Sequence, residues 1–161
     1  MKKTILILAA VFAICVGASA QRHSVPYAGV GVISNFNDKT GVGITAGFRN
    51  YNRNSFISVA VGAEAHGYFI PTSKNHSNSS KQFGVFGIPE IGVAIGPSVF
   101  KFYPHTGLMF GYDSFNSGFY WGGKNGLALD IGRHVTIDFS TYAPRYNFTA
   151  ATYAVNFIWR F

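Results

Sequence analysis

The chain of 161 residues has a single cysteine, few charged residues and no long apolar segment. Cys15 lies near the N-terminus, so the rest of the chain can form no disulfide or thiolate metal site and holds no cysteine nucleophile. The longest apolar run, Ile5 to Val16, is shorter than the roughly 20 residues that a membrane-spanning helix needs. No later segment shows helical periodicity, which argues against an α-helical domain.

The N-terminus has the three parts of a secretory signal peptide. Lys2 and Lys3 precede the apolar run, and Ala18-Ser19-Ala20 is a small-residue cleavage site. We therefore expect a signal peptide over residues 1–20 and one mature domain over 21–161. Lipidation at Cys15 is an alternative, although Ile14 stands where a lipoprotein signal has a small residue.

Charge gives little indication of a nucleic-acid partner. Loss of Lys2 and Lys3 leaves 11 basic and 6 acidic residues, a net charge of +5. These residues are scattered singly among apolar ones and form no basic patch. We expect no nucleic-acid binding.

What the sequence does contain is typical of a transmembrane β-barrel. Aromatic residues make up 17% of the chain, which also has 19 glycines. In the last strand, apolar residues alternate with Thr152, Ala154, Asn156 and Arg160, as in a wall with lipid on one side and a lumen on the other. The alternating apolar set, interpreted as an assembly signal, is Tyr153, Val155, Phe157, Trp159 and Phe161.

Period-two runs between turn signals predict an all-β fold, an eight-stranded antiparallel up-and-down barrel. The expected strands are 25–34, 40–50, 55–69, 82–96, 98–113, 120–132, 134–143 and 149–161. Connections at 50–54, 96–97 and 132–134 are short, whereas 70–81 is long and polar. Since short turns face the periplasm in such barrels, both mature termini are expected there.

The charged residues fall mostly on inward positions. An unpaired charge is costly in a narrow lumen, so these side chains should pair. With Ile95 and Ser98 flanking a tight turn, Glu90 lies diagonal to Lys101, and with Val135 opposite Phe161, Asp138 lies diagonal to Arg160. The predicted lumen network comprises Arg49, Glu64, Glu90, Lys101, Lys124, Asp130, Asp138 and Arg160.

This network favours a plugged lumen, because eight strands leave space for little more than side chains. A selective pore lined by the same residues is the alternative. Pro89 and Pro104 should lie opposite each other in one hairpin, where a bulge would accommodate them.

Three inward residues could instead form a metal or acid–base site: Glu64, His66 and His105. A hydrogen-bonded lumen cluster explains them as well, and we expect no metal, cofactor or catalytic residue. The long loop offers His76, Ser77, Ser79 and Ser80, but a loop of this composition would not hold them in register.

The mature chain resembles the small eight-stranded outer-membrane barrels of the OmpA/OmpX type. Its leader followed by Gln21 is similar to those of Bacteroidetes porin-family proteins, and its last strand to the signal read by the barrel-assembly machinery. The resemblance implies a barrel in the bacterial outer membrane, in contact with lipid and lipopolysaccharide. We expect a monomer with a structural or surface-interaction role and no enzyme activity. A small-solute pore and, less favoured, a lipid A-modifying enzyme are the alternatives.

Overall fold

The computed structural model describes residues 24–35, 40–71, 81–114, 118–145 and 151–161. The expected signal peptide, the alternative at Cys15 and the loop residues 76–80 lie outside the described residues. No described residue belongs to a helix that could span a membrane. The strands are β1 (Ser24–Asn35), β2 (Thr40–Asn50), β3 (Ile57–Ile70), β4 (Gln82–Ile95), β5 (Phe100–Asp113), β6 (Gly118–Ile131), β7 (Val135–Pro144) and β8 (Thr152–Arg160).

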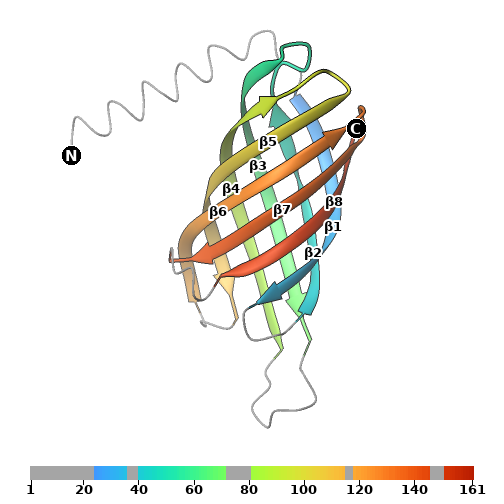
Figure 1. The fold of residues 1–161 in the computed structure, drawn as a ribbon. Coiled ribbons are helices and arrows are strands. Elements are labelled where there is room, and N and C mark those ends of the chain that lie inside the picture. The colour runs from blue at the N-terminus through green and yellow to red at the C-terminus, as the bar shows by residue number, and fades with distance from the viewer. Residues whose placement is uncertain (1–23, 36–39, 72–80, 115–117, 146–150) are drawn as a thin grey trace, which may run out of the picture.

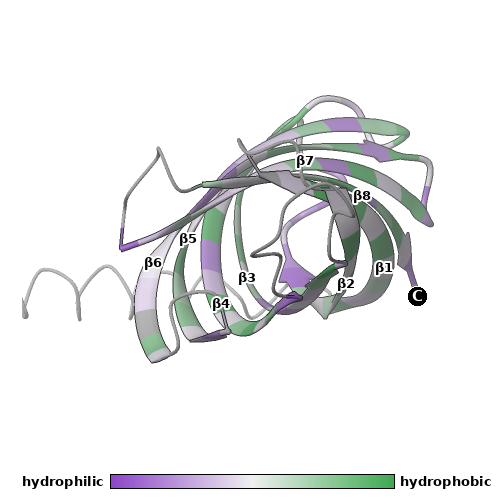
Figure 2. Cartoon of the chain, turned by 90° about the horizontal axis from the view of Figure 1, so that it is seen from below, coloured by the Kyte–Doolittle hydropathy of each residue, from purple (hydrophilic) through white to green (hydrophobic). Residues whose placement is uncertain are grey.

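The eight strands form a closed barrel in chain order (Figure 1). Every neighbouring pair is antiparallel, and β8 returns to pair with β1 from Tyr27↔Arg160 to Asn35↔Thr152. Figure 2 shows the strands following one another around the ring. The predicted up-and-down barrel is confirmed.

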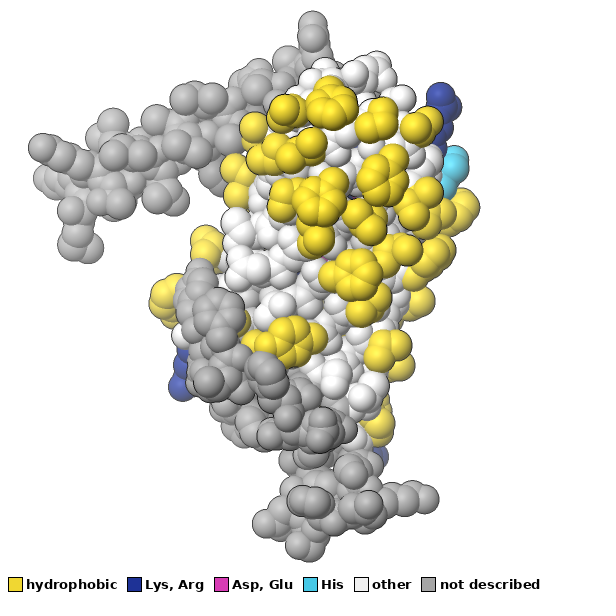
Figure 3. All heavy atoms as spheres, viewed as in Figure 1, with side chains coloured by type: hydrophobic (Ala, Val, Ile, Leu, Met, Phe, Trp, Pro, Cys, Tyr) yellow, Lys and Arg dark blue, Asp and Glu magenta, His cyan; other side chains and the backbone are white. Residues whose placement is uncertain are grey.

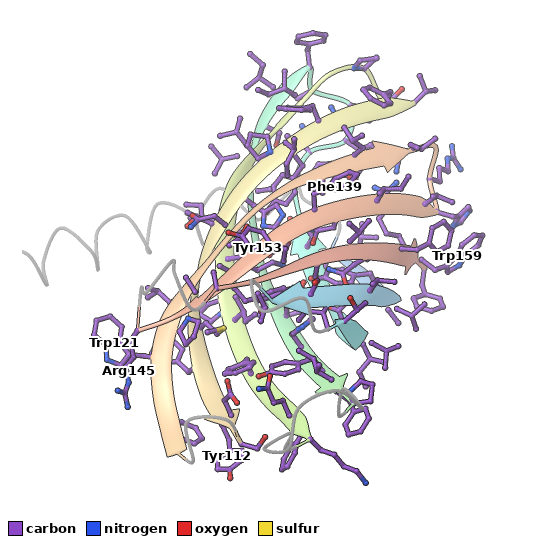
Figure 4. All side chains as sticks on the ribbon, turned by 60° about the horizontal axis from the view of Figure 1, so that its bottom comes forward. Tyr112, Trp121, Phe139, Arg145, Tyr153 and Trp159 are labelled. Atoms are coloured by element: carbon purple, nitrogen blue, oxygen red, sulfur yellow. The ribbon has the colours of Figure 1, made fainter. Side chains whose placement is uncertain are left out.

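The outer wall is apolar, as the alternation predicts. Its exposed side chains include Val30, Ile44, Phe102, Leu108, Phe139, Phe157 and Trp159. Figure 3 shows many such side chains on one face of the wall. In Figure 4, Trp121 and Trp159 lie toward opposite ends of the wall, where aromatic rings meet the bilayer interfaces of membrane barrels.

The interior is filled by layers of side chains. One apolar cluster contains Ile33, Ile70, Phe86, Ile88, Met109, Tyr142 and Ala154. A second cluster contains Tyr51, Ala60, Ala94, Tyr103 and Ala128. The first cluster contains residues near the strand ends beside the long connection at 71–81, and the second lies toward the short turns. Charged side chains between the two clusters are therefore shielded from both ends of the barrel.

The register between β4 and β5 differs from the prediction. The turn between them covers 96–99 rather than 96–97, with Gly96 at φ 127° and a hydrogen bond from the Phe100 amide to the Pro97 carbonyl (3.1 Å). Ile95 therefore pairs with Phe102, and Glu90 pairs with Gly107. The longer turn places Lys101 away from Glu90.

The expected arrangement of the prolines is also wrong. Pro89 pairs with Ala63 on β3, and Pro104 pairs with Leu127 on β6, so the two are not opposite each other. The β4–β5 ladder has one constant register and no bulge, but it lacks pairs at 88–89 and at 93–94. Each gap adjoins a proline, which has no amide hydrogen to donate.

The register between β7 and β8 is shifted as well. Val135 pairs with Trp159 rather than Phe161, and Asp138 lies opposite Asn156. The Phe161 amide donates instead to the Pro26 carbonyl on β1 (3.0 Å). The last residue thus takes part in closing the barrel and not in pairing with β7.

Candidate functional site in the barrel interior

All eight charged side chains of the predicted lumen network are buried, as is Asp113, which the alternation also places inward. They come from seven strands, Arg49 on β2, Glu64 on β3, Glu90 on β4, Lys101 on β5, Lys124 and Asp130 on β6, Asp138 on β7 and Arg160 on β8. Because charges are so rarely buried without partners, their contacts decide what this interior can do.

Lys124 lies at the centre of the cluster. Its Nζ is 2.8 Å from the Glu64 carboxylate, 3.3 Å from that of Glu90 and 3.6 Å from that of Asp138. Three carboxylates on three different strands therefore converge on one ammonium group that is 0% exposed. This arrangement joins β3, β4, β6 and β7 across the lumen.

His105 lies between two of the same carboxylates. Its Nε2 is 3.0 Å from Asp138 Oδ1, and its Nδ1 is 3.5 Å from Glu90 Oε2. The ring stacks on Tyr103 with centroids 4.9 Å apart. The imidazole is thus held by the hydrogen bond of Nε2 to Asp138 and by the stacking of its face on Tyr103.

Arg49 connects this centre to a second group of charges nearer the short turns. Its guanidinium is 3.4 Å from Glu90 and 3.6 Å from Asp130, and it lies 4.0 Å from the centroid of the Tyr103 ring. Cation–π contact and two carboxylates together compensate a fully enclosed cation. Arg49 makes the two groups one continuous network.

Arg160 and Asp130 form the second group. Arg160 Nη1 is 2.7 Å from Asp130 Oδ2 and donates to the Tyr51 hydroxyl at 2.9 Å. Arg160 Nη2 donates to the carbonyls of Gly132 and Val135. Asp130 also accepts from Thr136 Oγ1 at 2.6 Å. These contacts close the lumen at the end where β6 turns into β7.

Two predicted partnerships are wrong. Lys101 does not reach Glu90, and its Nζ donates to the carbonyls of Ser55 (2.6 Å) and Gly96 (2.7 Å). Arg160 binds Asp130 instead of Asp138. Both errors follow from the strand registers, since a diagonal pair changes whenever one strand slides along its neighbour.

Four tyrosines complete the network and were not predicted to do so. Tyr27 and Tyr142 donate to Glu64 at 3.1 and 3.3 Å, Tyr103 stacks under Arg49, and Tyr51 donates to Asp130. Tyr27, Tyr103 and Tyr142 lie on inward positions that the alternation could have identified. Tyr51 follows β2 in a turn, where no periodic signal exists.

Tyr51 lies outside the membrane-spanning strands and has a perturbed ionisation. Burial, followed by the neighbouring Asp130 carboxylate, raises the pKa of Tyr51 to about 12. Both effects disfavour a phenolate. Tyr51 is therefore a neutral hydrogen-bond donor at physiological pH.

The suggested acid–base site does not form as one constellation. His66 stacks on Tyr142 with centroids 4.2 Å apart, and its Nδ1 is 3.3 Å from the Tyr142 hydroxyl. His105 is engaged by Asp138 and Glu90 instead. Within the described residues, no group of three or more His, Cys, Asp or Glu side chains could hold a metal ion.

Comparisons with known proteins give structural likeness alone. No protein family and no curated protein sequence matches the chain. The structure is similar to a de novo designed transmembrane β-barrel, with 14% identity, a TM-score of 0.45 and coverage of 85% of this chain and 95% of the other. It is also similar to the Yersinia pestis outer membrane protein Ail, whose backbone structure is known in a phospholipid bilayer nanodisc, with 13% identity, a TM-score of 0.45 and coverage of 86% and 100%.

Proposed function

We propose that this protein is an integral outer-membrane β-barrel of the OmpA/OmpX type whose closed lumen supports a structural or surface-interaction role. The observation that carries the proposal is the continuous charge network centred on Lys124, which ties four strands together at distances of 2.8–3.6 Å. A barrel whose interior is an enclosed ion-pair cluster is a rigid support for the loops at its ends.

The same network argues against a pore. A conducting lumen needs side chains that contact water along its whole length, whereas Glu90, Asp138 and Lys124 are at most 5% exposed. The apolar cluster with Phe86, Ile88 and Met109 adds a second barrier, because apolar constrictions exclude water and ions.

Location and partners are inferred from the wall and from the sequence. The apolar exterior favours contact with lipid, and the expected signal peptide and the aromatic last strand are typical of proteins inserted by the barrel-assembly machinery. We place the turns at 51–56, 96–99 and 132–134, together with both mature termini, on the periplasmic side. The partners are then outer-membrane lipid and lipopolysaccharide, and no cofactor is needed.

We propose no catalytic role. His66 and His105 are both buried and held by side-chain contacts, so a substrate could reach neither without opening the barrel. Mass spectrometry of lipid A from cells with and without the protein tests this directly. A lipid A species that depends on the protein would show it to be an enzyme.

The decisive test of the closed lumen is single-channel recording of the purified mature protein in planar bilayers. We expect no steady open-channel current. In Glu90→Ala/Lys124→Ala, the centre of the network is removed, and any conductance should appear there first, with Lys81→Ala as the matched control on an exposed lysine. Steady currents from the unmodified protein would overturn the plug and establish the pore.

A further inference from the structure

Among the residues that the structure describes, the middle of the lipid-facing wall carries one polar interruption. Thr106 pairs with Asn125, and Asn125 pairs with Thr141, so these three outward residues lie side by side on β5, β6 and β7. On the other described strands, the outward positions away from the strand ends hold apolar residues or glycine. Examples of the apolar residues are Val30, Ile44, Val59 and Phe157.

The interruption lies within the apolar belt and not at its edge. On β6, Trp121 lies toward one end from Asn125 and Ile131 toward the other, and both are exposed. Four residues of a tilted strand place Asn125 roughly 10 Å from the level of Trp121. On β5, Thr106 is likewise flanked by Leu108 and Phe102. Asn125 and Thr106 therefore face hydrocarbon.

The hydrogen bonding of this patch is incomplete. Thr106 Oγ1 lies 2.9 Å from Asn125 Oδ1 and 3.1 Å from the Lys124 carbonyl, so its single proton is shared between these two acceptors. Within the described residues, the Asn125 Nδ2 amide donates to nothing, although the side chain is exposed. Hydrocarbon offers no acceptor, and a polar group left unpaired there is costly.

We propose that this patch, defined by Thr106, Asn125 and Thr141, is a contact surface for a second copy of the same chain within the membrane. An amide is both donor and acceptor, so two Asn125 side chains related by a two-fold axis can form reciprocal hydrogen bonds. The neighbouring threonines are small enough to let the walls approach closely, as small residues do between membrane helices. The monomer expected from the sequence is then replaced by a dimer that forms through β5–β7.

Self-complementarity selects the second copy over a lipid or an unrelated protein. Lipid chains cannot satisfy the Asn125 Nδ2 donor at this depth. A different partner would need an acceptor placed at the same height of its own apolar wall, whereas a copy of this chain supplies the Asn125 Oδ1 acceptor on an equivalent wall automatically. The surrounding Leu108, Leu127 and Phe139 provide apolar contact on both sides.

The test is association of the full mature protein in lipid vesicles, counted by single-molecule photobleaching over a range of protein-to-lipid ratios. We expect dimers for the parent, about tenfold weaker association for Asn125→Leu, and a smaller loss for Thr141→Val. Ile44→Leu, on an apolar part of the wall, is the matched control and should leave association unchanged. Heat-modifiable gel migration checks that every variant is a folded barrel.

Cysteine cross-linking gives an independent measurement, because the mature chain has no cysteine of its own. Leu127→Cys should form a disulfide-linked dimer under mild oxidation, and Ile44→Cys should not. A parent that stays monomeric at every protein density would overturn the proposal, as would equal association of Asn125→Leu. Cross-linking of Leu127→Cys in cells to a different protein alone would also overturn it, and would identify that protein as the occupant.

Discussion

At the level of single residues, Lys124 and Lys101 show how two buried lysines of one barrel can differ in importance. Lys124 contacts three carboxylates, whereas Lys101 donates to two backbone carbonyls near a turn. Loss of Lys124 removes the basic partner of the buried Glu64 and one of the basic partners of Glu90 and Asp138. Loss of Lys101 leaves two neutral acceptors at the edge of the lumen, which water can reach more easily.

We therefore expect Lys124→Ala to lower the free energy of unfolding by about 3–5 kcal/mol, the typical cost of an uncompensated buried charge. Lys101→Ala should cost about 1–3 kcal/mol, the penalty of unmade hydrogen bonds. The exposed Lys81→Ala serves as the reference. The measurement is urea unfolding in lipid vesicles, and equal losses for Lys124→Ala and Lys101→Ala would contradict the central place of Lys124.

Tyr51 gives a prediction about alkaline pH. Its pKa is raised to about 12, so the folded state favours the neutral phenol. The stabilisation is fully present below the unfolded pKa of about 10 and is lost as the pH rises from about 10 to 12. Over that range, the parent should lose about 2 kcal/mol more of its unfolding free energy than Tyr51→Phe.

The comparison with Tyr51→Phe removes the contributions of the other buried tyrosines, which both proteins share. Unfolding free energies measured at intervals between pH 9 and 12 give the two slopes. Parallel slopes would mean that Tyr51 does not carry the perturbed ionisation.

At the level of strands, β8 combines two tasks. Its outward residues include Tyr153, Phe157 and Trp159, which are exposed to lipid, while its inward Arg160 binds Asp130. The strand also pairs with both β7 and β1. Membrane contact and barrel closure therefore depend on the same short segment.

Replacing Trp159 and Phe161 with serine should strongly reduce the amount of barrel in the outer membrane while secretion continues, because both side chains contribute apolar interfacial contact. The measurement is the fraction of heat-modifiable protein in isolated outer membranes. Phe56→Ser, an exposed aromatic in a turn, is the control. Normal insertion of the double variant would show that barrel assembly does not depend on Trp159 and Phe161.

The strands themselves were predictable, and their registers were not. Period-two alternation located all eight strands within a few residues, because each has one face on lipid and one on the interior. The same alternation placed Glu64, Lys124 and Asp138 inside the barrel. It could not identify their partners, since those depend on the length of the 96–99 turn and on where β8 begins to pair, and neither leaves a periodic signal.

At the level of the whole molecule, the orientation in the membrane can be tested. The turn at 51–56 and the connection after Ile70 lie at opposite ends of the barrel, and the latter is the long polar one. Asn54 and Lys81 are exposed at these two ends. In the proposed orientation, Lys81 faces the outside of the cell and Asn54 faces the periplasm.

A membrane-impermeant maleimide should therefore label Lys81→Cys in intact cells, and should label Asn54→Cys only after the outer membrane is permeabilised. Cys15 is the only cysteine of the sequence and lies in the expected signal peptide, so each label can be assigned to the introduced residue. The reverse pattern would invert the proposed topology without affecting the fold.

The gaps in the β4–β5 ladder give the cylinder a mechanical asymmetry. Neighbouring seams carry unbroken series of pairs, whereas this one lacks them beside Pro89 and beside Pro104. Along the length of these two strands, the backbone is therefore held in separate short stretches of pairs, from Gly84 to Gly87, from Glu90 to Gly92 and at Ile95. The interrupted seam lies in the middle of the chain and away from the β1–β8 junction, where the described first and last strands pair without a gap.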